Sequence, residues 1–159
     1  MQYQTVFFDF DGVILDSVHV KTEAFAAMFR QYGPEIEKAV VDYHLANGGV
    51  SRFKKFEYFY KHLLNKPIDQ HTLESLGNEF NQLVLDKIIQ APFIPGALET
   101  LKNLKLKEIP TFIVSGTPEE EIKLIVEKRG LTTYFFEVHG SPRKKEEILL
   151  DIIKRYYLS

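Results

Sequence analysis

The sequence contains no cysteine. This absence excludes disulfide bonds, catalytic thiols and thiolate-bound metal ions, and it is compatible with a reducing compartment. The chain also has little excess of either charge: 20 Lys and Arg residues stand against 22 Asp and Glu residues, which gives a net charge of -2. Such a balance provides no long-range attraction to polyanions. We therefore expect neither a nucleic-acid partner nor an anionic membrane surface.

Long apolar runs are also missing. The N-terminus has no basic region followed by a long apolar stretch, and acidic residues interrupt every stretch that could span a bilayer. We therefore expect a cytoplasmic protein. With 159 residues, 45% of them hydrophobic and 26% charged, the chain is typical of one globular domain or of a domain that carries an insertion.

The order of the expected elements predicts an α/β fold. Aromatic and β-branched residues predict a first strand at 3–10, and a later part of the chain alternates between strand and helix patterns. The later elements are helices at about 96–106, 118–129 and 143–157 and strands at about 109–115 and 134–139. Such alternation is typical of a parallel, Rossmann-like sheet with right-handed crossovers.

A helical insertion separates the first strand from the rest of this sheet. From about 17 to 91, apolar residues recur with helical spacing, and Gly, Pro and Asn mark the breaks between three or four helices. One crossover needs far fewer residues. We therefore expect a Rossmann-like core of residues 1–15 plus 93–159 and a helical cap subdomain of residues 16–92.

Two carboxylates follow the first strand in the segment "DFDG". In an extended segment Asp9 and Asp11 point to the same side, so both can reach one ligand. Two ionised carboxylates ~4 Å apart repel by roughly 4 kcal/mol at an effective dielectric of about 20, so a cation or a shared proton is needed. Oxygen ligands without cysteine favour magnesium over zinc. A turn with helix-capping acids is the alternative.

Two further loops are expected at the same edge, because ligands of open parallel sheets bind beyond the carboxyl ends of the strands. In "VSGTP", the hydroxyls of Ser115 and Thr117 and the free N–H groups of a helix start suit a phosphate group, although the same residues are ordinary helix caps. In "SPRKKEE", Lys144 and Lys145 oppose the dipole of the helix that they begin, which suggests another benefit such as anion binding, while a solvated charge run is the alternative.

Together, these segments resemble the haloacid dehalogenase-like hydrolase superfamily, especially its phosphoglycolate phosphatase and β-phosphoglucomutase-like branch with a helical cap. The segments "DFDGVILDS", "FIVSGT" and "GSPRKKEEIL" are similar to its first three motifs. The resemblance implies that Asp9 is a nucleophile that forms an aspartyl-phosphate, and that Asp11 is the general acid and then the base. It also implies Mg²⁺ bound by the Asp9 carboxylate and the Asp11 backbone carbonyl.

The resemblance also implies residues that bind the substrate. The phosphoryl group would be held by Ser115 and by Lys145, with Lys144 as the alternative lysine, and by the loop glycines Gly12 and Gly116. In the cap, "GGVSRF" is similar to a loop that reads the distal part of the substrate. Arg52 would bind a phosphate, carboxylate or sugar hydroxyl of the substrate through its planar guanidinium. The alternative is a surface arginine at a helix start.

The expected function is therefore a magnesium-dependent phosphohydrolase of a small phosphorylated metabolite, for example a sugar phosphate. A phosphomutase of the same family and a non-catalytic phosphate-binding or interaction module are the alternatives. The family's fourth motif, a strand ending in acidic residues that complete the magnesium site, has no match after Lys145. We expect an unpaired edge on the first strand, and hence a fragment, or a dimer in which another chain covers that edge.

Overall fold

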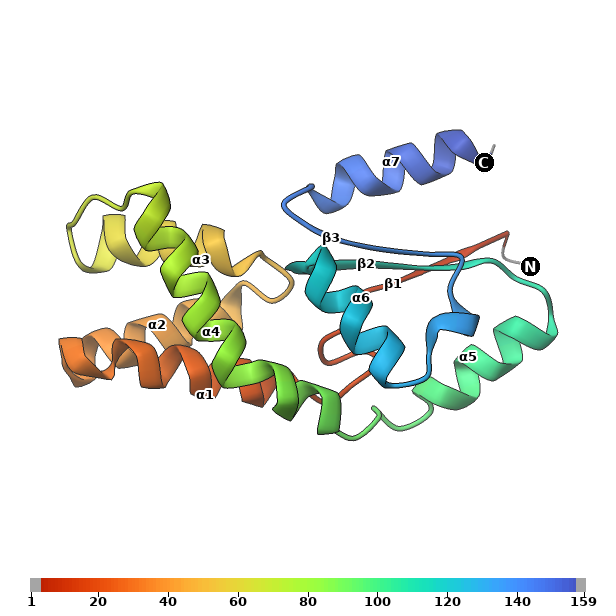
Figure 1. Ribbon diagram of the computed structural model, residues 1–159, viewed down its shortest axis with the longest axis horizontal. Coiled ribbons are helices and arrows are strands. Elements are labelled where there is room, and N and C mark those ends of the chain that lie inside the picture. The colour runs from red at the N-terminus through yellow and green to blue at the C-terminus, as the bar shows by residue number, and fades with distance from the viewer. Residues whose placement is uncertain (1–3, 157–159) are drawn as a thin grey trace. The chain divides into compact units, whose positions relative to one another are not determined.

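The computed structural model describes residues 4–156, which form two compact units (Figure 1). One unit, the core, comprises Met1–Asp16 and Ala91–Ser159, and the other, the cap, comprises Ser17–Gln90. Residue 3 of the expected first strand and residue 157 of the expected last helix lie outside the described residues.

The core contains a parallel sheet with the strand order β1-β2-β3. Its strands are β1 (Val6–Phe8), β2 (Thr111–Pro118) and β3 (Glu137–Ser141). Both pairings are parallel, as the sequence predicts. The register of β2 against β3 shifts between Val114 and Pro118, so β2 becomes irregular where the predicted phosphate loop begins.

The third strand lies further along the chain than the expected 134–139. Residues Thr132–Tyr134 form a short 3-10 helix, and the strand begins only at Glu137. The aromatic segment that suggested a strand connects the 3-10 helix to β3: the Phe136 N–H donates to the Thr111 carbonyl, but Phe136 is 62% exposed and the strand pairing begins at Glu137. Strand propensity reflects packing on a sheet, and here residues Glu137–Ser141, rather than the aromatic segment before them, form the strand beside β2.

Helices cover both faces of the core sheet, with α7 (Lys145–Arg155) on one face and α6 (Glu119–Lys128) on the other (Figure 1). A third helix, α5 (Ala97–Leu106), precedes β2. Alternate residues of a strand point to opposite faces, so Phe112 and Val114 share the face that meets α7. There they are buried with Ile148 and Ile152 in one hydrophobic cluster.

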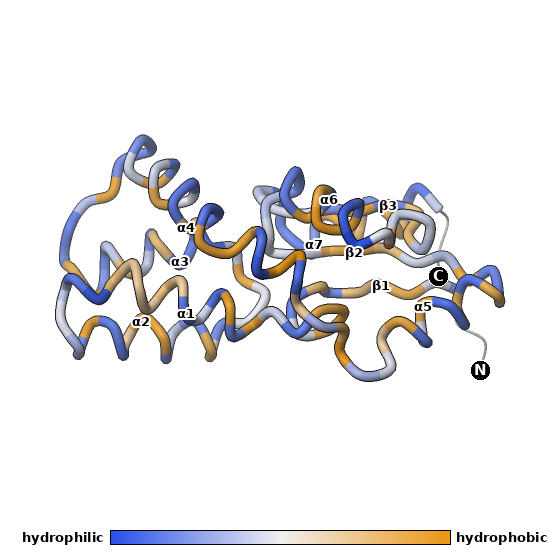
Figure 2. Tube along the Cα trace, turned by 60° about the horizontal axis from the view of Figure 1, so that its bottom comes forward, coloured by the Kyte–Doolittle hydropathy of each residue, from blue (hydrophilic) through white to orange (hydrophobic). Residues whose placement is uncertain are grey.

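The cap consists of helices packed around phenylalanine side chains. The helices are α1 (Val18–Phe29), α2 (Pro34–Ala46), α3 (Arg52–Tyr58) and α4 (Gln70–Gln90), with a 3-10 turn at Arg30–Tyr32 and a π-helical turn at Phe59–Leu63. Hydrophobic and hydrophilic residues alternate along them (Figure 2). The buried rings are Phe25, Phe29, Phe56, Phe59 and Phe80. This cluster gives the cap a hydrophobic core of its own.

None of the helices within residues 4–156 combines the length and the apolar character that crossing a membrane would require.

Candidate active site

The chain makes a tight turn directly after β1, at residues 12–14. The Phe10 ring is fully buried, and the Phe10 N–H donates to Asp9 Oδ1 at 2.8 Å. Gly12 adopts a φ of 73°, in the left-handed region that glycine tolerates, and its N–H donates to the Leu15 carbonyl at 2.8 Å. The turn is therefore held by backbone hydrogen bonds, and it places Asp9 and Asp11 beyond the carboxyl end of β1.

A lysine from the other end of the chain meets the first of these carboxylates. The Nζ of Lys145 lies 2.7 Å from Asp9 Oδ2, and the two side chains are 31% and 34% exposed. Lys145 is the first residue of α7, whereas Lys144 occupies the N-cap position before the helix and is exposed. Of the two lysines that the sequence left open, Lys145 is the one that pairs with Asp9.

The last residues of β2 contact the second carboxylate. The Thr117 hydroxyl donates to Asp11 Oδ2 at 3.2 Å, and the Thr117 N–H donates to the Ser115 hydroxyl at 3.1 Å. Ser115 and Thr117 are only 1% and 4% exposed, and Gly116 lies half-buried between them. The bond from Thr117 to Asp11 is a feature that sequence reasoning missed, since no local pattern relates residues 106 positions apart.

The core thus brings together most of the residues that the sequence predicts for the site. Asp9 with Lys145 and Asp11 with Thr117 form two bonded pairs, and Ser115 is bonded to the second pair. A nucleophile candidate, an acid candidate, a hydroxyl and a cation therefore share the carboxyl edge of one parallel sheet. This set can bind and transfer an anionic group.

Arg52 belongs to the cap, where it is the first residue of α3. Its side chain is only 5% exposed. The guanidinium carbon lies 4.6 Å from the centroid of the Phe80 ring, and Nη1 donates to the Gly77 carbonyl at 3.4 Å. Within the cap these contacts hold the guanidinium in place by a cation–π interaction and a hydrogen bond.

Magnesium is the ion that the resemblance implies, and the donors present suit it in type. The carboxylate of Asp9 and the backbone carbonyl of Asp11 are oxygen ligands, which Mg²⁺ prefers. Among residues 4–156, no group of three or more His, Cys, Asp or Glu residues is arranged to hold a metal ion. Mg²⁺ is commonly bound by one or two carboxylates together with water and substrate phosphate, so the two donors fit it as part of a larger ligand set.

Two glutamates of the core, Glu119 at the start of α6 and Glu137 at the start of β3, are strongly hydrogen-bonded. Glu137 accepts two hydrogen bonds from Arg155 and one from the Tyr156 hydroxyl, each of 2.7 Å, and these bonds hold the pKa of Glu137 far below its usual value. Partial burial favours the neutral form of Glu119, but hydrogen bonds from Lys123, His139 and the Gly140 N–H outweigh it and lower the pKa of Glu119. Both carboxylates are therefore ionised at neutral pH.

The arrangement so far defines a Rossmann-like α/β protein with a candidate active site at the carboxyl ends of its strands. A family model described as haloacid dehalogenase-like hydrolase matches residues 3–159. The chain therefore belongs to the haloacid dehalogenase-like hydrolase family. A comparison with curated protein sequences found no match.

Solved structures of the same fold include proteins described as phosphatases and as a phosphomutase. A predicted phosphoglycolate phosphatase from Haemophilus somnus is 15% identical with a TM-score of 0.72, and the match covers 99% of this chain and 73% of that one. A predicted phosphatase from Clostridium acetobutylicum is 18% identical, with a TM-score of 0.73 and coverages of 99% and 72%. The β-phosphoglucomutase of Clostridium difficile is 18% identical, with a TM-score of 0.74 and coverages of 96% and 70%.

Proposed function

We propose that the protein is a magnesium-dependent phosphohydrolase that acts on a small phosphorylated metabolite, in particular a sugar phosphate. The observation that carries the proposal is the ion pair of Lys145 with Asp9, 2.7 Å long, beside the hydrogen bond from Thr117 to Asp11. The cation beside Asp9 suits a nucleophile, and the hydroxyl that donates to Asp11 suits a residue that transfers protons.

The proposed reaction has two displacements at phosphorus. In the first, a carboxylate oxygen of Asp9 attacks phosphorus, the bond from phosphorus to the alcohol oxygen breaks, and Asp11 gives its proton to that oxygen. In the second, water attacks the phosphorus of the aspartyl-phosphate and transfers a proton to Asp11, and the bond from phosphorus to Asp9 breaks. Inorganic phosphate leaves, and Asp9 is again a carboxylate and Asp11 again an acid.

Other residues of the core would bind the phosphoryl group during both steps. Ser115, Gly12 and Gly116 would face its oxygens, and Lys145 would move from Asp9 to the phosphoryl oxygens as the charge shifts. When bound by the Asp9 carboxylate and the Asp11 carbonyl, magnesium would supply further positive charge to offset that of the phosphoryl group.

The cap would recognise the part of the substrate beyond the phosphate. Arg52 carries a planar guanidinium that matches carboxylates, phosphates and sugar hydroxyls. Its contacts with Phe80 and Gly77 would orient that fork within the cap. A pre-oriented guanidinium loses less conformational freedom when it binds a ligand.

Release of p-nitrophenol from p-nitrophenyl phosphate in the presence of Mg²⁺ tests the proposal. We expect Asp9→Asn to abolish turnover, since the amide is a poor nucleophile, and Asp86→Asn on α4 to retain it, because Asp86 is an exposed carboxylate of the cap. Chelation of the metal should stop the reaction of the unmodified protein. Turnover by Asp9→Asn at the rate of the unmodified protein would refute the assignment of the nucleophile.

The similarity in fold to a β-phosphoglucomutase favours a phosphomutase as the second candidate. A mutase would isomerise a sugar phosphate without net release of phosphate, so a product assay by phosphorus NMR separates the two reactions. A third candidate is a non-catalytic phosphate-binding module. It would bind inorganic phosphate without turnover and would dimerise through the edge of β1, which pairs with β2 alone among the described strands.

A further inference from the structure

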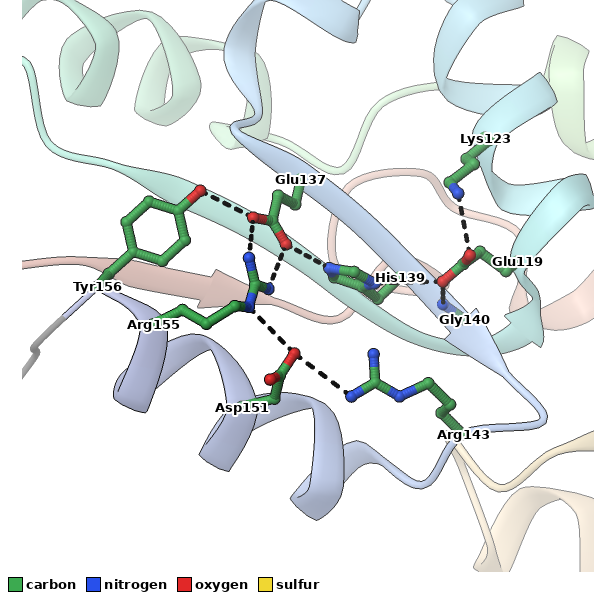
Figure 3. Close-up of polar contacts among 9 residues, drawn as sticks. All are labelled: Glu119, Lys123, Glu137, His139, Gly140, Arg143, Asp151, Arg155 and Tyr156. Carbon is green, nitrogen blue, oxygen red and sulfur yellow. Dashed lines mark hydrogen bonds and ion pairs between the residues drawn. The ribbon is translucent and has the colours of Figure 1, made fainter.

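A network of polar side chains joins α6, β3 and α7 (Figure 3). At its centre, the imidazole of His139 lies between two glutamates. The Nδ1 atom of His139 is 3.2 Å from Glu119 Oε1, and its Nε2 atom is 2.6 Å from Glu137 Oε2. The side chain of His139 is only 16% exposed, so the ring is held within the network rather than in solvent.

Each of the two glutamates has further partners besides His139. Glu137 also accepts from Arg155 and Tyr156, and Glu119 also accepts from Lys123 at 2.9 Å. These bonds lower the pKa of both carboxylates, so both are ionised at neutral pH, and each joins His139 to further side chains.

Glu119 contacts the backbone of β3 as well. Its Oε1 atom accepts a hydrogen bond from the Gly140 N–H at 3.4 Å. A Cβ atom at Gly140 would collide with the Thr117 carbonyl oxygen and would lie 2.7 Å from the Glu119 N. The start of α6 and the end of β3 therefore approach more closely than any residue other than glycine permits at position 140.

This contact connects the segments that carry the candidate phosphate residues. Glu119 follows Thr117, whose hydroxyl bonds Asp11, by two positions in the chain. Gly140 precedes Lys145, which bonds Asp9, by five positions. A shift between α6 and β3 would therefore change the separation of Ser115 and Thr117 from Lys145.

We propose that Glu119 is a positioning residue, which ties the end of β2 to the end of β3 through the His139 side chain and the Gly140 N–H. It thereby sets the spacing of the hydroxyl and lysine groups that meet the phosphoryl group. The effect on phosphate binding and catalysis rests on the proposed function, whereas the contact of Glu119 with His139 and Gly140 does not.

The neighbouring glutamate provides a matched control. Glu119 and Glu120 both lie in the first turn of α6, where negative charge is favourable at the helix N-terminus. Glu120 is exposed, whereas Glu119 reaches the β3 backbone. Glu119→Ala and Glu120→Ala therefore change helix propensity and helix-dipole interaction alike, and they differ in the contacts with β3 and in the ion pair of Glu119 with Lys123.

The experiment combines a local probe with a binding measurement on the whole chain. Amide hydrogen exchange and backbone NMR shifts report on Gly140, Thr117 and Lys145, and nitrogen shifts of the His139 ring report its protonation. Titration with inorganic phosphate gives a dissociation constant, and p-nitrophenyl phosphate with Mg²⁺ gives kcat and KM. Thermal unfolding of each variant measures any general loss of stability.

For Glu119→Ala we expect exchange of the Gly140 amide and the phosphate dissociation constant each to rise about tenfold, the size expected for a lost charge-assisted contact. KM should rise with them while kcat changes less, since the link acts on phosphate binding. Glu119→Gln should recover much of the loss, because its amide oxygen still accepts from Gly140. Glu120→Ala should match the unmodified protein.

Equal behaviour of Glu119→Ala and Glu120→Ala in exchange and in phosphate affinity would overturn the proposal. If the unmodified protein neither binds phosphate nor turns over substrate, the proposed function fails, and the link is then judged by the shifts of Gly140, Thr117 and Lys145 alone. If Glu119→Ala does not fold, Glu119→Gln decides by the same measurements, with a smaller change of the same direction expected and no change overturning the proposal.

Discussion

Lys145 Nζ and Asp9 Oδ2 lie 2.7 Å apart although 136 positions separate the two residues in the chain. Each is about one-third exposed, so the pair is partly shielded from water yet open to a ligand. One cation here relieves part of the repulsion between Asp9 and Asp11 that the sequence leads us to expect. The same cation is well placed to hold a phosphoryl oxygen.

Replacement of the two adjacent lysines should have unequal effects. Lys145→Ala removes the partner of Asp9, and we expect kcat/KM for p-nitrophenyl phosphate to fall on the order of a hundredfold, as for loss of one charged group at a reacting centre. Lys144→Ala should change kcat/KM less than about twofold, because Lys144 is exposed and precedes the helix. Equal losses in the two variants would contradict this assignment.

The hydrogen bond from Thr117 to Asp11 should matter for proton transfer. Thr117→Val keeps the shape of the buried side chain but removes the donor to Asp11 Oδ2. We expect kcat to fall about tenfold, in line with the loss of one hydrogen bond to a charged group. Thr117→Ser retains a hydroxyl and should restore most of the rate. A valine variant with the kcat of the unmodified protein would show that Asp11 is oriented without Thr117.

The stability of the core should decrease in acid because of Glu137. Hydrogen bonds from Arg155 hold the pKa of Glu137 in the folded chain below its value in the unfolded chain, about 4.3. A lowered carboxyl pKa adds stability that is fully present above the unfolded pKa and is lost as the pH falls toward the folded pKa.

Glu137→Gln should therefore reduce the free energy of unfolding by about 1–2 kcal/mol at neutral pH and flatten its decline below about pH 4.5. Urea denaturation at a series of pH values measures both effects. Glu99→Gln on α5 is the control, since Glu99 is an exposed carboxylate. The same slope for Glu137→Gln as for the unmodified protein would refute the role of Glu137.

Two phenylalanines of the core should differ sharply in their contribution to stability. Phe112 is fully buried between the sheet and α7, whereas Phe136 is 62% exposed. Phe112→Ala leaves a cavity, and we expect it to lower the free energy of unfolding by about 3–5 kcal/mol. Phe136→Ala should cost about 1 kcal/mol or less, since little area is lost. Similar denaturation midpoints of the two variants would argue against α7 packing on β2.

Much of the fold was predictable because it depends on local patterns. Alternation of strands and helices predicted the parallel sheet, and helical spacing of apolar residues predicted the helical insertion. The prediction was less accurate at β3, where aromatic residues 134–136 suggested a strand that begins only at Glu137. Propensity could not show that Phe136 remains exposed, because exposure depends on what packs beside it.

The sequence by itself determined the order of helices and strands in this protein, the residue types at the ends of its strands and its resemblance to one hydrolase family. Only the tertiary structure decided that Lys145 rather than Lys144 meets Asp9, that Thr117 bonds Asp11, and that Glu119 contacts His139 and Gly140. The physical reason is that these contacts join residues far apart in the chain. Their distances follow from the packing of α6 and α7 on the sheet, which no local pattern encodes.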